Sequence, residues 1–354
     1  MPADRRIAGM RVALELAKRG VRGANPLVGA VVIDSSGNIL ATGYHRGAGT
    51  PHAEADALTR LGPIPAEAAR KATMLVTLEP CNHVGRTGPC AQAIIDAGIG
   101  NVVYAAKDEG SEAAGGAERL RAAGVNVEQG LLESEALDLN HRWFLARAGQ
   151  RPFTTLHLAQ TLDGRIAAAD GTSQWITSPA SLLHAHQIRS RVDAIVVGTG
   201  TVLADDPRLN ARDEDGQPFD RQPRRIVMGK REIPEGAALA ADANWEQIRS
   251  HDPRTVLGRL HESGISHVLI EGGSSIITAF LAEDLIDEIY LYQAPIFLGA
   301  GRQSIGDLGV GTLGEARAFR LDPIDGESVQ ILGTDTLTHL EPMPIRLPAR
   351  STAS

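Results

Sequence analysis

The chain has 354 residues, of which 43% are hydrophobic, 22% charged and 4% aromatic, and its formal net charge at pH 7 is -8. This length is sufficient for two hydrophobic cores, and no apolar run approaches the roughly 18 residues that would span a bilayer. The acidic balance and the few aromatic rings argue against a nucleic-acid partner, which would need clustered Lys and Arg or stacking rings, and favour a small-molecule substrate.

The N-terminal half alternates between helical and strand patterns. Apolar residues at helical spacing predict a first helix over Arg6–Lys18, ended by Gly20. Runs of β-branched and apolar residues predict strands at Val28–Asp34, Ile39–Tyr44, Thr73–Leu78, Asn101–Ala106 and Val125–Glu128. Further helices are predicted at His52–Leu61, Cys90–Ala97, Ala117–Ala123 and Ala136–Arg147. We therefore expect an α/β domain over residues 1–147.

A candidate zinc site lies in this half. The only two cysteines, Cys81 and Cys90, each follow a proline in one segment downstream of His52 and Glu54. One imidazole and two thiolates fill three corners of a tetrahedron and leave the fourth for a water, whose pKa the metal can lower to about 7. His-x-Glu followed by Pro-Cys and a second Cys is typical of zinc deaminases, in which the Glu carries protons and is not a ligand. The predicted ligands also start two helices, whose dipoles favour thiolates.

Other interpretations of these residues are weaker. Two cysteines could be small buried hydrophobes, but both lie in one loop behind a His-x-Glu motif. A disulfide is not expected, because Met1–Arg6 leads into a helix pattern and not into a signal peptide, so we predict a cytoplasmic protein with reduced thiols. A purely structural zinc would require four protein ligands, and the sequence offers three.

A domain boundary is expected near Ala146–Pro152, after which strands and helices alternate again. The predicted strands are Phe153–Leu158, Asp193–Val197, Arg225–Met228, His267–Ile270 and Glu288–Ala294. The predicted helices include Ser181–Ser190 and Arg254–Ser263. We expect a second α/β domain over residues 151–340, followed by a poorly ordered tail over residues 341–354 that is rich in Pro, Ser and Ala.

Two turns of the second half are rich in glycine and hydroxyl groups. Gly198–Thr201 and Gly272–Ser275 each follow a predicted strand. Ligands bind at the carboxyl ends of strands in open α/β sheets, and exposed backbone N–H groups there suit phosphates. Neither turn carries a complete Rossmann fingerprint, so the pattern favours a nucleotide-like ligand without identifying it.

An ordered set of motifs covers nearly the whole chain: His52–Glu54, Thr77–Cys81, Gly85–Cys90, Leu162–Gly164, Trp175–Thr177, Thr201–Pro207 and Glu271–Gly273. This set resembles the bifunctional deaminase–reductase family of riboflavin biosynthesis, the RibD family. The resemblance implies an N-terminal zinc cytidine-deaminase-like α/β/α domain and a C-terminal dihydrofolate-reductase-like α/β domain. It implies zinc-dependent hydrolytic deamination of 2,5-diamino-6-(5-phosphoribosylamino)pyrimidin-4(3H)-one. NADPH would then reduce the ribosyl side chain of 5-amino-6-(5-phosphoribosylamino)uracil to ribityl.

The resemblance also implies roles for individual residues. The zinc ligands would be His52, Cys81 and Cys90, with Glu54 as the catalytic proton carrier. The deaminase substrate would contact Asn25, His45, His83 and Arg86. NADPH would contact Ala159, Trp175, Thr201 and Asp205. The reductase substrate would contact Ser173, Arg189, Leu209, Arg212 and Glu271, of which the two arginines suit a phosphate.

Several positions depart from the family pattern. His157 stands where a Lys is usual, Ser181-Leu182 replaces an Ala-Arg pair, Met228–Lys230 replaces a Leu-Asp pair, and Asp108–Ser111 lacks an expected Asn. One alternative is therefore an active deaminase with a reductase-like domain that is not catalytic. Another is a stand-alone cytidine or tRNA deaminase with an unrelated appendage, which the acidic charge disfavours. A homo-oligomer is compatible with the sequence, which does not define the number of subunits.

Overall fold

The structure is a computed structural model that describes residues 3–82, 88–108, 115–322 and 327–343. The chain divides into two compact units, and the break falls between Arg147 and Ala148. Each unit is described separately below. None of the described helices is both long and apolar enough to cross a membrane.

The first unit is built on a five-stranded mixed sheet with the strand order β2-β1-β3-β4-β5. Strand β1 pairs antiparallel with both β2 and β3, whereas β3, β4 and β5 are parallel to one another. The strands are β1 (Gly29–Ile33), β2 (Ile39–Tyr44), β3 (Thr73–Leu78), β4 (Asn101–Ala106) and β5 (Asn126–Gln129). The helices are α1 (Ala3–Ala17), α2 (Ala53–Leu61), α3 (Ala66–Lys71), α4 (Cys90–Asp96), α5 (Gly116–Ala122), α6 (Glu133–Leu139) and α7 (His141–Ala148).

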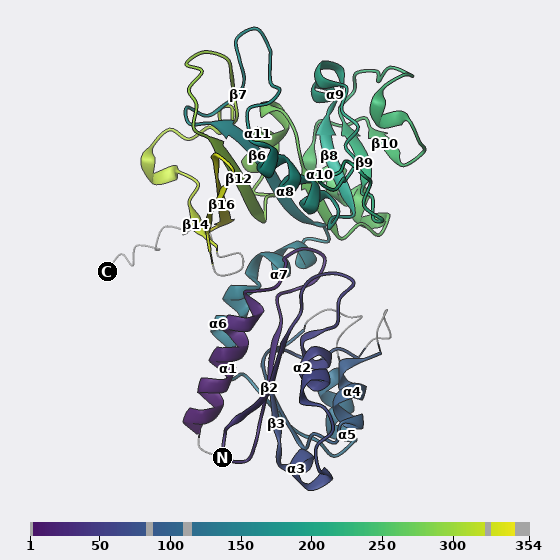
Figure 1. The fold of residues 1–354 in the computed structure, drawn as a ribbon, viewed down its shortest axis with the longest axis vertical. Coiled ribbons are helices and arrows are strands. Elements are labelled where there is room, and N and C mark those ends of the chain that lie inside the picture. Colours follow the sequence, from purple (N-terminus) through teal and green to yellow (C-terminus); the bar gives the residue numbers. More distant parts are fainter. Residues whose placement is uncertain (1–2, 83–87, 109–114, 323–326, 344–354) are drawn as a thin grey trace, which may run out of the picture. The chain divides into compact units, whose positions relative to one another are not determined.

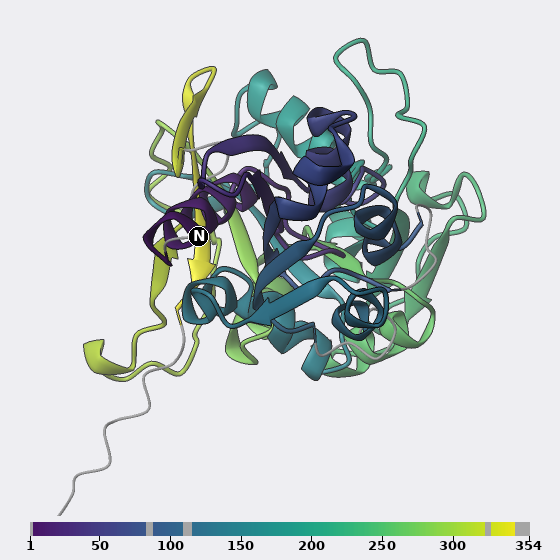
Figure 2. The same ribbon diagram turned by 90° about the horizontal axis from the view of Figure 1, so that it is seen from below.

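Two apolar cores cover the two faces of this sheet. On one face, α1 and α6 pack Met10 and Ala136 against Val31, Leu75 and Val103 of the sheet. On the other face, α2, α4 and α5 pack against alternate residues of the same strands, for example Val32, Met74, Val76, Val102 and Tyr104. The alternation follows from the period of two along a strand. Figures 1 and 2 show the resulting three layers, which confirm the α/β/α architecture expected for the N-terminal half.

The single helix predicted over Ala136–Arg147 is wrong, because the structure has two helices, α6 and α7, separated at Asn140. The Asn140 side chain turns inward and is 4% exposed. Its Oδ1 accepts a hydrogen bond from the Leu27 N–H at 2.8 Å, and its Nδ2 donates to the Leu27 carbonyl at 2.9 Å. A side chain that pairs with a remote backbone in this way competes with continued helix, so a long-range contact determines this break.

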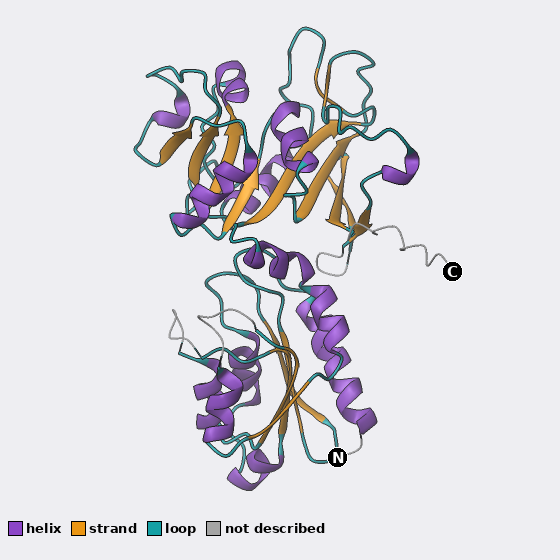
Figure 3. Ribbon diagram, turned by 180° about the vertical axis from the view of Figure 1, so that it is seen from behind, coloured by secondary structure: helices purple, strands orange, loops and turns teal. Residues whose placement is uncertain are grey.

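The second unit is built on a nine-stranded sheet with the order β10-β9-β8-β11-β6-β12-β16-β14, in which β15 also pairs with β16. Figure 3 shows the strands of this unit with helices packed beside them. The strands from β10 to β12 along this order are parallel, and β14, β15 and β16 are antiparallel additions. The strands are β6 (Phe153–Thr161), β8 (Ala194–Gly198), β9 (Arg224–Met228), β10 (Trp245–Ile248), β11 (His267–Ile270), β12 (Glu288–Ala294), β14 (Phe319–Leu321), β15 (Val329–Leu332) and β16 (Asp335–Pro342). A separate pair is formed by β7 (Arg165–Ala167) and β13 (Arg302–Gln303).

Helices cover this sheet and follow its strands. They are α8 (Pro179–Arg189), α9 (Thr199–Asp205), α10 (Pro253–Glu262) and α11 (Ser274–Ala282), with short 3-10 turns at Ala238–Ala240 and Leu313–Glu315. The main apolar core packs α10 and α11 against residues such as Leu156, Val268 and Ile289. Helix α8 packs on the opposite face of the sheet, where His184 forms a hydrogen bond with Tyr292 of β12. Residues 344–354 of the predicted tail lie outside the described residues.

Candidate functional site

Three potential metal ligands of the first unit converge from separate elements. His52 is the N-cap of α2, Cys81 follows β3, and Cys90 is the first residue of α4. Their ligand atoms all lie within 4.8 Å of one another. His52 Nδ1 lies 3.6 Å from Cys81 Sγ and 3.3 Å from Cys90 Sγ. The predicted placement of these segments at helix starts is thus confirmed for His52 and Cys90.

These distances fit one zinc ion. Ligand atoms at about 2.0–2.3 Å from a tetrahedral centre lie roughly 3.5 Å apart, close to the two separations from His52 Nδ1. The set offers one nitrogen and two thiol sulfurs, which is a donor set that zinc prefers and which leaves one coordination position open. No other group of three His, Cys, Asp or Glu residues in the described part of the chain meets the same criterion.

Glu54 lies in the first turn of α2, two residues after His52, and is 3% exposed. Burial raises the pKa of its carboxyl to about 7, and the nearby Cys81 thiolate adds to the rise. A group with a pKa near the ambient pH can both take up and release a proton. The carboxyl next to the three potential ligands is therefore suited to proton transfer.

Close packing holds Cys81 in place. The N-terminus of α5 lies against Pro80, so that a Cβ on Gly116 would be only 1.7 Å from the Pro80 carbonyl oxygen. The buried Glu79 carboxylate accepts a hydrogen bond from the Ala117 N–H at 3.2 Å, and the Cys90 N–H donates to Cys81 Sγ at 3.4 Å. The segment that carries the first cysteine is thereby fixed from both sides.

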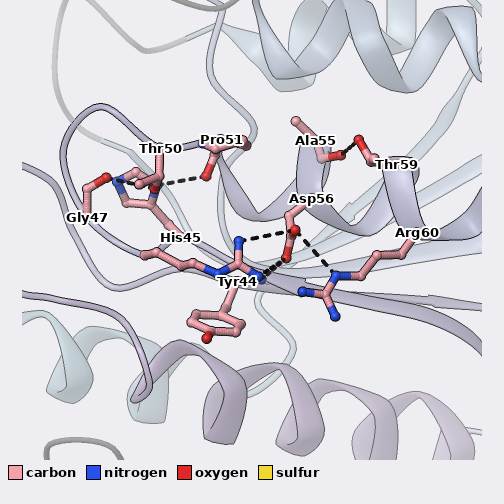
Figure 4. Close-up of polar contacts among 10 residues, drawn as sticks. Tyr44, His45, Gly47, Thr50, Pro51, Ala55, Asp56, Thr59 and Arg60 are labelled. Atoms are coloured by element: carbon pink, nitrogen blue, oxygen red, sulfur yellow. Dashed lines mark hydrogen bonds and ion pairs between the residues drawn. The ribbon is translucent and has the colours of Figure 1, made fainter.

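The predicted substrate contacts Asn25 and His45 are brought together. Asn25 Nδ2 donates to His45 Nε2 at 2.9 Å. His45 Nδ1 donates to the Pro51 carbonyl at 3.0 Å, as Figure 4 shows. The His45 ring lies 5.3 Å from the His52 ring, centroid to centroid. Burial lowers the pKa of His45, which agrees with a neutral ring that donates at one nitrogen and accepts at the other. His83 and Arg86, the other two predicted contacts, lie outside the described residues.

The Asp56 side chain on α2 connects this helix to the end of β2 by hydrogen bonds. The carboxylate accepts hydrogen bonds from the Tyr44 N–H at the end of β2, and from the Arg46 guanidinium at 3.2 Å through both nitrogens (Figure 4). Arg60, one turn further along α2, bonds to the same carboxylate at 3.3 Å. These contacts hold together the two ends of the loop that contains His45 and leads to His52.

A cavity of about 630 Å³ opens in the second unit at the carboxyl ends of its parallel strands. Its walls include the turn Gly198–Thr201 after β8 and the turn Gly273–Ser275 after β11. Thr201, a predicted NADPH contact, lines it. Asp205, at the end of α9, is exposed and accepts a hydrogen bond from Ser173 Oγ at 3.4 Å, so these two predicted contacts also lie together.

Predicted substrate residues form a charged cluster beside this cavity. Arg189 Nε and Nη2 donate to the two carboxylate oxygens of Glu271 at 2.8 and 2.6 Å. Burial disfavours both charges, but the pairing holds the pKa of Glu271 below and that of Arg189 above its ordinary value. Arg212 reaches His186 Nε2 at 3.4 Å with one terminal nitrogen, while its buried Nε has no partner. The Arg189 guanidinium contacts the other nitrogen of His186 at 3.5 Å.

The remaining predicted residues of the second unit are placed as follows. Ala159 lies on β6 opposite Tyr292 of β12. Trp175 is 69% exposed, so its side chain is not part of the core. Leu209 has a φ of +54° and is 4% exposed, so its side chain is part of the protein interior. His157, on the same face of β6 as Ala159, has a pKa lowered by burial although Glu271 opposes the shift.

Sequence reasoning missed two residues near these sites. His186 lies three residues before Arg189 on α8, and burial lowers its pKa to about 4, with a further contribution from Arg189. Its helical spacing from Arg189 was the available signal. Arg231 lines the cavity, but it lies beyond a strand in a segment without a recognisable motif, so no local pattern indicated it.

The chain is similar to known proteins over nearly its whole length. Residues 4–106 match the cytidine and deoxycytidylate deaminase zinc-binding region, and residues 152–325 match the RibD C-terminal domain. The riboflavin biosynthesis protein RibD of Mycobacterium tuberculosis is 44% identical over 324 residues, which cover 91% of this chain and 92% of that protein. RibD of Escherichia coli is 35% identical over 368 residues, which cover 94% and 98%.

Solved structures agree with these matches. Acinetobacter baumannii RibD has a TM-score of 0.72 and 33% identity, with 96% of this chain and 99% of that chain covered. A Thermotoga maritima protein named a diaminohydroxyphosphoribosylaminopyrimidine deaminase/5-amino-6-(5-phosphoribosylamino)uracil reductase has a TM-score of 0.66 and 32% identity, with the same coverage. The chain belongs to the RibD family of riboflavin-biosynthesis enzymes, in which a zinc-binding deaminase domain precedes an NADPH-dependent reductase domain.

Proposed function

We propose that the first unit hydrolyses the 2-amino group of 2,5-diamino-6-(5-phosphoribosylamino)pyrimidin-4(3H)-one to give 5-amino-6-(5-phosphoribosylamino)uracil and ammonia. The second unit then reduces the ribosyl side chain of this product to ribityl with NADPH. The reactions named for the Thermotoga maritima relative support this assignment. The donor set of the first unit and the charged cluster of the second unit supply the groups that each step requires.

In the deaminase, His52, Cys81 and Cys90 would hold zinc. Bound zinc supplies a Lewis acid with an open position for the attacking water. The Glu54 carboxylate would take one proton from the attacking water and pass it to the pyrimidine ring nitrogen. It would then move the second proton of that water to the departing amino group, so that the ring carbon keeps the oxygen as a carbonyl and ammonia leaves. The raised pKa of the Glu54 carboxyl, about 7, suits both transfers near neutral pH.

The substrate of the deaminase is oriented by the pair Asn25 and His45. Because His45 donates to Pro51 and accepts from Asn25, its ring is fixed and the Asn25 amide is held with its oxygen available to a ligand. An amide oxygen accepts hydrogen bonds from the N–H and amino groups of a diaminopyrimidine. His83 and Arg86 are proposed as further contacts, with Arg86 at the phosphate.

In the reductase, bound NADPH supplies the hydride, and the protein orients the two reactants. Ala159, Trp175, Thr201 and Asp205 are proposed to contact the cofactor. On the substrate side, Ser173 and Leu209 complete the set Arg189, Arg212 and Glu271.

A positive charge near the reductase substrate does not depend on His157. Burial lowers the pKa of this ring, and the Arg189 guanidinium is paired with Glu271, whereas Arg212 pairs with no carboxylate in the described residues and supplies a positive charge. Arg212 is suited to the substrate phosphate, because its buried Nε has no partner in the described part of the protein. The replacement of the usual Lys by His157 is therefore compatible with reduction.

The single observation that carries the proposal is the convergence of His52, Cys81 and Cys90 next to a carboxyl, that of Glu54, which is 3% exposed. The test is zinc-loaded Glu54→Gln beside the unchanged protein. Glutamine keeps the shape of the side chain but cannot act as an acid or a base, so ammonia release should fall about 10²- to 10⁴-fold.

Zinc content and NADPH oxidation with supplied 5-amino-6-(5-phosphoribosylamino)uracil should remain unchanged in the variant. Zinc content is measured by atomic absorption and NADPH oxidation by its absorbance. Undiminished ammonia release from E54Q would contradict the role of Glu54. An unchanged protein that releases no ammonia would contradict the deaminase assignment, and one that oxidises no NADPH would leave the second unit without the proposed activity.

We further propose that the enzyme acts in the cytoplasm on this small molecule without a nucleic-acid partner. Both cysteines are free thiols, which suits metal binding in a reducing compartment. The net charge of -8 opposes binding to a polyanion.

A further inference from the structure

The cavity at the ends of the parallel strands is built for an anion. The residues that line it include Arg231, His251 and Arg302, and no Asp or Glu occurs among its described lining residues. The chain as a whole carries a net charge of -8, so this local excess of basic groups is not a consequence of composition. Hydroxyl groups of Thr199, Thr201, Ser274 and Ser275 complete a polar lining.

The backbone around Arg231 is fixed. Gln247 on β10 donates through Nε2 to the carbonyl oxygens of Gly229 at 2.8 Å and of Arg231 at 2.7 Å. Gly229 has a φ of +129°, and a Cβ at this position would lie 2.9 Å from Thr199 Oγ1. The glycine at this position therefore permits a close approach of the loop after β9 to the turn after β8.

Because the two loops lie close together, the Arg231 side chain reaches the cavity. Its Nε donates to Thr199 Oγ1 at 3.3 Å, and its Nη2 lies 2.9 Å from where a Cβ on Gly200 would be. In the described part of the protein no carboxylate pairs with this arginine, whereas Arg224 and Arg249 nearby bind Glu246 and Glu232. The guanidinium is thus held over the cavity with its terminal nitrogens available to a ligand.

The position of Arg231 along the sheet indicates which part of a dinucleotide it meets. The proposed substrate cluster around Glu271 lies at the end of β11, and Ala159 lies on the adjacent strand β6. The nicotinamide ring must be near these residues, because it delivers hydride to the substrate. Strands β8 and then β9 follow on the other side of β11, so Arg231 lies at the end of the cavity remote from the nicotinamide.

The two glycine- and hydroxyl-rich turns between these ends suit the pyrophosphate, which every nicotinamide dinucleotide carries. We infer that Arg231 binds the 2'-phosphate of the adenosine and thereby selects NADPH over NADH. An arginine near the ribose is a general means of accepting a 2'-phosphate, and its planar fork bonds two oxygens at once. This inference rests on the proposed binding of NADPH in this cavity.

The test measures binding by isothermal titration of the full chain with NADPH and with NADH. Arg231→Gln should weaken NADPH binding by about 10- to 100-fold, the loss expected for one charge-assisted contact, and leave NADH binding within about twofold. Two smaller ligands probe the adenosine end alone. Arg231→Gln should weaken the binding of adenosine 2',5'-bisphosphate and leave that of adenosine 5'-phosphate nearly unchanged.

The matched control is Arg254→Gln, which removes the same charge from α10. Arg254 is 60% exposed and pairs with Glu283 at 2.9 Å, and it is not part of the cavity lining. It should leave both affinities unchanged. Equal losses for NADPH and NADH in R231Q, or no loss for either, would overturn the role of Arg231 alone. Failure of the unchanged protein to bind either dinucleotide would overturn the cofactor site itself.

Discussion

The two units stabilise their buried ionisable groups in opposite ways. In the first unit, Glu54 is buried without a salt bridge in the described residues, and burial raises its pKa to about 7. In the second unit, Glu288 is just as inaccessible and the Glu271 side chain is only 9% exposed, but Arg189 and His339 hold the pKa values of these two carboxyls below the ordinary value despite burial. The first site thus holds a carboxyl whose charged form is destabilised beside a set of metal ligands, whereas the second holds charges that compensate one another.

This difference indicates what each site depends on. A site in which a bound metal would supply the positive charge depends on the packing that holds its ligands close together. A site made of mutually paired side chains loses its balance when a single partner is removed, because a buried charge is then left alone. The second unit should therefore be sensitive to changes of charge and the first to changes of shape.

The largest effect is expected from Glu271→Gln. The carboxylate and its partner Arg189 are 9% and 18% exposed, so the variant leaves a mostly buried guanidinium unpaired. Removing one member of a buried pair costs about 3–5 kcal/mol of stability. Hydrogen exchange of peptides from β11 and β12 should show this loss together with the loss of reductase activity, while ammonia release should not change.

The double variant Arg189→Met, Glu271→Leu is the control for this prediction. It removes both charges and should regain most of the stability without regaining reduction, since apolar replacements of a buried pair are often neutral or stabilising. If Glu271→Gln alone cost less than about 1 kcal/mol, the second unit would not depend on compensated charge.

A smaller effect is expected from pH, through His339. Burial opposes its charge, but Asp322 at 3.2 Å and Glu288 at 3.0 Å raise its pKa from 6.5 to about 9. Because the folded-state pKa is the higher one, the stabilisation is complete below about pH 6.5 and is lost as the pH rises through 9. The second unit should lose about 3 kcal/mol across this range.

Pulse proteolysis in urea, with fragments of the second unit identified by mass, measures this dependence at each pH. His339→Gln should be less stable at pH 6.5 and should show a flat profile up to about pH 9. A profile that stays steep in the variant would assign the titration to another group.

The first unit's strands were predictable because each is a local pattern. Strands β2, β3 and β4 have the bounds that their apolar runs predict, and the His-x-Glu and two-cysteine motifs carry the metal ligands at the ends of such elements. The break of the helix at Asn140 was not predictable, because it depends on a contact with Leu27, which is remote in sequence.

The second unit was less predictable for the same physical reason. Strand β16 contains the buried groups His339 and Glu341, whose charges are compensated by Glu288 on β12 and Arg320 on β14. A strand with such residues does not show the alternation expected for a half-buried sheet, and its partners can be identified only in three dimensions. His186 and Arg231 were missed likewise, because their roles depend on neighbours from other strand ends.

The smallest effect tests the dependence of the first unit on shape. In Gly116→Ala, the new Cβ would lie 1.7 Å from the Pro80 carbonyl oxygen and 2.8 Å from its carbon, both backbone atoms next to Cys81. The helix or the cysteine segment must shift, which should cost about 1–3 kcal/mol and accelerate zinc release to a chromophoric chelator. No charge is altered, so any loss of zinc arises from packing.

Gly258→Ala in α10 is the matched substitution in the second unit. Apart from its chain neighbours and the backbone of its own helix, no atom of the described residues lies within 4 Å of its new Cβ. The same change should therefore stabilise the helix by about 0.5–1 kcal/mol and leave zinc release unaltered. If Gly116→Ala lowers stability and Gly258→Ala raises it, the ligand geometry of the zinc site depends on the close approach of α5 to Pro80. Equal zinc release from both variants would instead show that the metal ligands retain their positions without that contact, and that the contrast between the units is one of charge alone.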